Sequence, residues 1–232
     1  MTPASRSPLP LLLLLLSVTT GLVDAVSVLG LGKVFTANMT GNVVFLGFAA
    51  MGTPGFHPLS YLVAIGGFLA GAFVAGRTGK AHEGRPLHRW LMTAALIEAT
   101  LLWAAALVST RFDIASQSPD TALLGIVVLT ALAMGFRNAT VRQLKVPDLT
   151  TTVLTLTLTG LAADSSAAGG TNPNWARRIA SVVAIFLGAA LGAFLLAHPG
   201  PWGGMATALT LAGCLVLGGT MACAWLPARQ EG

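Results

Sequence analysis

The sequence predicts an all-α fold, a polytopic bundle of transmembrane helices in which residues 1–232 form a single integral membrane domain. Hydrophobic residues make up 54% of the chain and charged residues only 9%, whereas soluble domains carry about 25% charged residues. The mean hydropathy is +0.77, and the apolar residues gather in runs close to the ~20 residues that cross a bilayer. This composition excludes a disordered chain and a cytosolic enzyme, since one small core could not bury so much apolar surface.

Eight apolar runs can be marked along the chain: Leu9–Leu31, Val34–Met51, Leu59–Gly76, Leu91–Ser109, Thr121–Phe136, Val146–Ala163, Ile179–Ala197 and Met205–Leu226. The second and the sixth differ from the others because polar residues interrupt them. The interruptions are amides and hydroxyls, namely Asn38, Thr40 and Asn42 in the second run and Thr150, Thr151, Thr152, Thr155, Thr157 and Thr159 in the sixth.

The basic residues decide between eight spans and six. If every run crosses, basic residues are divided between the two sides. If the two polar runs enter and return on one side, every basic residue except Lys33 and Arg111 lies on the same side as the N-terminus. Cytoplasmic loops carry an excess of Lys and Arg. We therefore expect six spans with two broken or re-entrant segments, and cytoplasmic N- and C-termini.

The N-terminus has two interpretations. Arg6 followed by Leu9–Leu16 and the small residues around Asp24 resembles a secretory signal peptide with its cleavage site. However, the apolar run continues to Leu31, and the sequence at its end recurs later in the chain. We expect a retained first span.

An internal repeat divides the chain into residues 9–109 and 121–226. Three parallels occur in the same order: Gly21–Ala25 with Gly135–Ala139, Thr36 and Thr40 with Thr151 and Thr155, and Gly67–Phe73 with Gly188–Phe194. Three spans plus one re-entrant segment cross the membrane an odd number of times, so the second half begins from the opposite face. The sequence thus predicts an inverted-topology repeat whose two polar segments meet near the midplane.

The polar segments supply most candidates for a substrate site. Non-helical backbone survives at membrane depth only beside protein or water, and we expect such breaks at Gly41 and Pro147. The stretch Leu154–Gly160 alternates like a strand, but an unpaired strand is excluded in lipid, which predicts a helix there. The threonines have two interpretations, cavity lining or hydroxyls bonded to the preceding turn of their own helix. The candidate substrate-binding residues are Asp24, Asn38, Thr40, Asn42, Asn138, Thr151, Thr155 and Thr159.

Three further candidates for ion coupling carry charge within or beside the runs: Asp24, Glu98 and Arg137. An intramembrane carboxylate is costly and therefore suggests function. Asp24 matches the neutral Asn138 in the repeat, and we expect it to pair with the adjacent Arg137; the alternative is an N-cap of a half-helix. Glu98 is a candidate for a protonatable coupling group or for a structural residue bonded to a neighbouring helix.

Two stretches, Gly21–Gly47 and Met134–Asp164, resemble the YoaK family of bacterial six-span membrane proteins of undefined function. The most specific parts are FTANMTGN at residues 35–42 and VPDLTTT at residues 146–152. The resemblance covers most of the chain and implies a bacterial inner-membrane protein of a kind often labelled a small-molecule transporter. Arg137 departs from the family pattern, where a polar amide such as Gln is frequent.

These observations favour a secondary transporter or facilitator for an unidentified small solute or ion, with its site between the two polar segments. The alternatives are a channel, or a non-transporting membrane protein for assembly or regulation. We expect no enzyme, cofactor or metal, because no nucleophile–base set, Walker loop or metal-ligand spacing occurs. The expected partners are membrane lipid and a possible second copy of the chain, which the small-residue faces allow. The basic loops are expected to set topology and not to bind nucleic acid.

Overall fold

The computed structural model describes residues 8–144 and 154–225 and contains eight α-helices and one 3₁₀ turn within them. No strand occurs in these two ranges. The helices are α1 (Leu9–Gly30), α2 (Met39–Ala50), α3 (Pro58–Ala81), α4 (Leu87–Ser109), α5 (Asp120–Leu144), α6 (Leu154–Ala163), α7 (Trp175–Ala197) and α8 (Gly204–Trp225), with the turn η1 (Ser166–Ala168) between α6 and α7.

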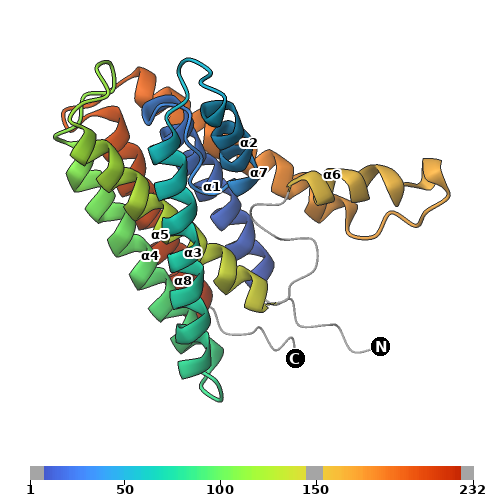
Figure 1. The fold of residues 1–232 in the computed structure, drawn as a ribbon. Coiled ribbons are helices and arrows are strands. Elements are labelled where there is room, and N and C mark those ends of the chain that lie inside the picture. Colours follow the sequence, from blue (N-terminus) through green and yellow to red (C-terminus); the bar gives the residue numbers. More distant parts are fainter. Residues whose placement is uncertain (1–7, 145–153, 226–232) are drawn as a thin grey trace.

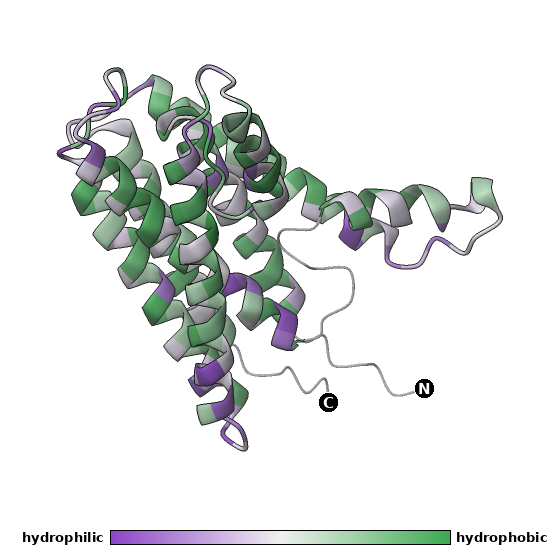
Figure 2. Cartoon of the chain, viewed as in Figure 1, coloured by the Kyte–Doolittle hydropathy of each residue, from purple (hydrophilic) through white to green (hydrophobic). Residues whose placement is uncertain are grey.

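Six of these helices are long and apolar enough to cross a membrane, and α2 and α6 are shorter. The predicted helical membrane bundle is therefore confirmed. The hydrophilic residues gather at the helix ends, while the lengths of the helices are largely apolar (Figure 2). The Leu–Thr alternation after residue 153 forms helix α6, as predicted.

The first helix lies at the centre of the bundle and packs against α5, α7 and α8, and α4 packs against α5 and α8. The loops after α1, α2, α4 and α7 lie at one end of the bundle, and the α3–α4 turn lies at the other (Figure 1). Arg77, Lys80 and Arg85 stand at the α3–α4 end, while Lys33 and Arg111 stand in loops at the opposite end.

Two close helix crossings hold the bundle together, α1 against α7 and α3 against α5. In the first, a side chain at Gly21 or Gly188 would overlap the carbonyl oxygen of Ile185 or Val18, respectively. Only glycine admits such a backbone approach, and small residues are the usual means of packing helices in lipid.

The second crossing is built in the same way. Gly71 lies against the carbonyl of Leu132, and Gly135 lies against the carbonyl of Phe68. In both crossings, therefore, each of the two helices places a glycine against a backbone carbonyl of the other.

The two short helices lie apart from each other. Helix α2 packs against α3 at the end of the bundle where α1 ends, whereas α6 packs against α7 and projects from the side of the bundle (Figure 1). The expected meeting of the two polar segments is therefore not found in the described residues.

The break in the first polar segment also differs from the expected one. It falls at residues 31–38, and Gly41 lies inside α2. Gly41 instead makes room for the ring of Phe35, which packs directly onto the first turn of α2. The other expected break, at Pro147, lies outside the described residues.

Candidate functional site

An ion pair is buried in the middle of the bundle. Arg137 of α5 donates from Nε to Oε1 of Glu98 on α4 at 2.6 Å, and its Nη2 bonds the same oxygen. The side chains of Arg137 and Glu98 are 0% and 5% exposed. Two hydrogen bonds from one buried guanidinium make this a charge-assisted contact of the strong kind.

The guanidinium also reaches the first helix. Its Nη1 donates to the carbonyl oxygen of Leu16 at 3.0 Å and to Oγ1 of Thr20 at 2.9 Å. One arginine thus joins α1, α4 and α5. The predicted pair of Asp24 with Arg137 was wrong, because the packing of α4 on α5 brings Glu98 to the guanidinium instead.

Asp24 lies one turn beyond Thr20 on the same face of α1, at i and i+4. Its carboxylate lies near the backbone N–H of Ala37 and within range of the charge of Arg137. Its Oδ1 is buried and has no hydrogen-bond partner. The alternative role as an N-cap was also wrong, because α1 runs on unbroken to Gly30. Asp24, which is half-buried, and the buried Thr20, Arg137 and Glu98 are called the polar cluster below.

The segment between α1 and α2 reaches Asp24 through the backbone N–H of Ala37. Asn42 fixes this segment, since its Nδ2 donates to the carbonyl of Phe35 at 2.5 Å and its Oδ1 accepts from the N–H of Phe35 at 2.9 Å. Asn42 is fully buried. Asn38 is the N-cap of α2, with its Oδ1 3.5 Å from the N–H of Gly41. Asn42 therefore has a structural role, because it holds the backbone of Phe35, and the exposed Asn38 has one as the N-cap of α2.

Two buried hydroxyls near this segment were not among the predicted site residues. Thr36 is adjacent to Ala37, is fully buried, and its Oγ1 has no partner. Tyr61 of α3 is also fully buried with an unpartnered hydroxyl, and its ring packs on Phe45 of α2 at 5.8 Å. The sequence pointed to Thr36 through its match with a threonine in the second half of the chain. Nothing in the sequence singled out Tyr61 as a buried polar residue.

The remaining predicted residues do not join this group. Asn138 on α5 is half-buried and donates to the carbonyl of Met134 at 2.8 Å. Thr40 is exposed on α2, and Thr155 and Thr159 are exposed on α6. Thr151 lies outside the described residues. Of the predicted substrate residues in the described ranges, Asp24 and Asn42 contact residues 31–38 with side chains that are half-buried and buried, respectively.

A small cavity adjoins the ion pair. It has a volume of about 20 Å³ and is lined by Glu98, Arg137, Thr140 and Thr220 among others. The Oγ1 of Thr140 is buried without a partner. About 10–15 Å³ of such volume holds one water molecule, so the cavity has room for a single water beside the charges.

The chemistry open to this site is binding and proton exchange. Within the described ranges no three His, Cys, Asp or Glu side chains gather as a metal site would require. The polar cluster offers one carboxylate committed to a cation, Glu98, and a second without an ion-pair partner, Asp24. A carboxylate with one oxygen unpartnered, such as that of Asp24, can take up a proton, a cation or a hydrogen-bonding solute.

Comparison with known proteins agrees with this membrane architecture. Residues 12–221 match the family described as "Protein of unknown function (DUF1275)". The chain is 35% identical over 157 residues to the UPF0700 transmembrane protein YoaK of Bacillus subtilis (strain 168). The aligned residues make up 67% of this chain and 66% of that protein. No solved structure matches.

Proposed function

The chain belongs to the DUF1275 family of proteins of unknown function, and from its own geometry we propose that this multi-pass membrane protein is a secondary transporter or facilitator of a small solute. The observation that carries the proposal is Asp24: an intramembrane carboxylate whose Oδ1 is buried without a partner. Burying an unpaired polar atom costs free energy, and one at membrane depth usually marks a substrate or ion pathway.

The Glu98–Arg137 ion pair places a positive charge near the carboxylate of Asp24. Arg137 is held by Glu98 and by Thr20, one turn below Asp24. Its positive charge acts on Asp24 without neutralising it through a direct bond. In this proposal Asp24 binds the solute or the coupling proton, and the Glu98–Arg137 pair holds the three helices around it.

A gated carrier is favoured over a channel. The cavity beside the ion pair, about 20 Å³, accommodates one water and not a continuous polar pore. In this proposal, movement of residues 31–38, which Asn42 holds in place through two hydrogen bonds to Phe35, uncovers the buried Oδ1 of Asp24. We propose this segment as the gate.

The proposal includes two inverted halves. It is supported by the matching crossings of α1 on α7 and α5 on α3, in each of which both helices place a glycine against a backbone carbonyl of the other. The neighbours of the short helices also correspond, α2 with α3 and α6 with α7. The proposed site lies within the first half, since Thr155 and Thr159 are exposed on α6.

The proposed orientation has both termini in the cytoplasm of a bacterial inner membrane. The end of the bundle that carries Arg77, Lys80 and Arg85 would then face inward. Reporter fusions at the two chain ends and at the α4–α5 loop give the test. Cytoplasmic activity for both ends and periplasmic activity for the loop are expected.

Uptake in proteoliposomes tests the function. The purified chain is reconstituted and screened against pools of radiolabelled small solutes, with and without a pH gradient. Wild-type protein should accumulate one solute class, and Asp24→Asn should abolish uptake while retaining the bundle. Asp120→Asn, at the exposed start of α5, is the matched carboxylate control and should transport normally. Unchanged uptake by Asp24→Asn would refute the role of Asp24.

One observation favours the second candidate, a membrane assembly or regulatory protein. Helix α6 projects from the bundle, and its Leu156 and Leu158 are 70% and 50% exposed. Such an arm suits contact with another membrane protein or a second copy of the chain. Absence of flux for every pool, together with a stable partner on detergent pull-down that is lost when Leu156 and Leu158 become Ser, would favour this candidate over transport.

A further inference from the structure

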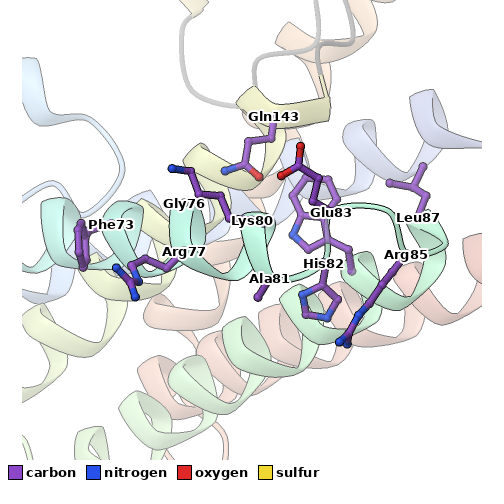
Figure 3. Close-up of a pocket in the computed structure, with 12 residues that line it drawn as sticks. Phe73, Gly76, Arg77, Lys80, Ala81, His82, Glu83, Arg85, Leu87 and Gln143 are labelled. Atoms are coloured by element: carbon purple, nitrogen blue, oxygen red, sulfur yellow. The ribbon is translucent and has the colours of Figure 1, made fainter.

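A basic cleft lies at the turn between α3 and α4 (Figure 3), at the end of the bundle opposite to the loop that follows α1 (Figure 1). It has a volume of about 1170 Å³ and is open to the surroundings. Its lining combines three cations with three large apolar residues, Phe73, Leu87 and Trp90, and Phe73 and Leu87 lie at opposite ends of it (Figure 3). The site proposed for transport uses none of these residues.

The charges of the cleft are not balanced within it. Arg77, Lys80 and Arg85 line it together with one carboxylate, that of Glu83. In the described part of the chain no ion pair involves any of these four side chains. The cleft therefore carries an excess of positive charge with its hydrogen-bond donors available.

Hydrogen bonds and close packing fix the α3–α4 end of the bundle, where the cations of the cleft lie. His82 Nδ1 lies 2.9 Å from the carbonyl of Thr78, and its Nε2 lies 3.3 Å from Oγ1 of Thr93 on α4. The ring thus ties the turn to both helices. On the opposite wall, the amide of Gln143 packs directly onto Gly79, where a side chain would overlap it.

The start of α4 adds further donors. Pro86 precedes the helix, and no side chain caps its first turn. The free N–H groups at the N-terminus of a helix favour anions. Leu87, the first residue of α4, lines the cleft.

We propose that this cleft binds the phosphate of an anionic phospholipid. The excess positive charge and the start of α4 attract the phosphate, and the apolar lining residues Phe73, Leu87 and Trp90 offer contacts to the first part of an acyl chain. Inorganic phosphate would make no contacts with these apolar residues, so a lipid, which has both a phosphate and an apolar chain, is favoured. Basic pockets between transmembrane helices at the cytoplasmic side are the usual seats of such headgroups. The inference does not depend on the proposed transport.

Native mass spectrometry of the delipidated, full-length protein tests the proposal, with phosphatidylglycerol and phosphatidylcholine of identical acyl chains as probes. Wild-type protein should retain phosphatidylglycerol preferentially. Each basic residue near such a surface contributes about fivefold, so Lys80→Gln with Arg85→Gln should reduce that preference roughly 25-fold. Glu83→Gln should increase it about fivefold. Lys33→Gln with Arg111→Gln, at the opposite end, is the matched control and should leave it unchanged.

Other outcomes overturn the inference. Equal retention of the two lipids, or equal loss in the cleft and control variants, would mean general surface charge and not a site. Displacement of phosphatidylglycerol by millimolar inorganic phosphate would assign the cleft to free phosphate. The Glu83→Gln variant removes only a charge and tests the proposal even if the double variant is unstable. An unchanged preference for phosphatidylglycerol in Glu83→Gln would then overturn the proposal.

Discussion

Neutralising Glu98 should strongly destabilise the bundle. In Glu98→Gln the shape is kept and only the charge is lost, which leaves Arg137 buried with Leu16 and Thr20 as its other partners. The pair is almost fully enclosed, at 0% and 5% exposure. Removing one member of such a pair costs about 3–5 kcal/mol, and the Gln oxygen can still accept one bond, so we expect about 3 kcal/mol.

Thermal unfolding in detergent measures this loss. A domain of this size changes its midpoint by about 2–4 °C per kcal/mol, so Glu98→Gln should lower it by roughly 6–12 °C. The double variant Glu98→Gln with Arg137→Gln removes both charges and should recover most of that loss, since a matched neutral pair is not costly. Asp164→Asn, which breaks the partly exposed pair with Arg178, should cost under about 1 kcal/mol. A double variant that loses the sum of the two single effects would refute the coupling.

Three further predictions follow from local contacts. Gly71→Ala places a Cβ against a backbone carbonyl and should cost about 2–3 kcal/mol, whereas Gly66→Ala, with open space around it, should be neutral in the same unfolding assay. Asn42→Ala removes both bonds that hold residues 31–38, and at about 1 kcal/mol for each bond amide exchange there should rise some tens-fold by mass spectrometry. Hydrogen bonds hold the pKa of Asp113 below its ordinary value near 3.8, and the one from the hydroxyl of Ser116 has a larger effect than the next, which comes from a backbone N–H. Ser116→Ala should raise that pKa in an NMR titration; the loop contact is present above the ordinary pKa and is lost as the pH falls through the lowered value.

The six long helices were predictable because each is a continuous apolar run of sufficient length. The break in the first polar segment was predicted in the right region but at the wrong residue. Gly41 suggested a flexible point, yet it lies in helix α2 and gives space to the ring of Phe35. A glycine serves equally for bending and for close packing, and the sequence alone does not separate the two.

The candidate site was predictable in its residue types and not in its pairings. Asp24, Glu98 and Arg137 stood out because charge is scarce within apolar runs. Which carboxylate meets Arg137 depends on how α4 and α5 rotate and cross, and the match of Asp24 with Asn138 in the repeat pointed to the wrong partner. The exposure of Thr155 and Thr159 likewise follows from the direction in which α6 leaves the bundle.

The crossing of α1 on α7 has a consequence for biosynthesis. The carbonyl of Val18 is covered only when Gly188 arrives, and most of the chain is made between the two. At bacterial and eukaryotic elongation rates of about 5–20 residues per second, the first helix waits on the order of ten seconds for its partner. During that interval Arg137 is also inserted, and it needs Glu98 and α1 beside it at once. The surface of α1 that packs on α7 therefore stays without its partner helix until the seventh helix leaves the ribosome.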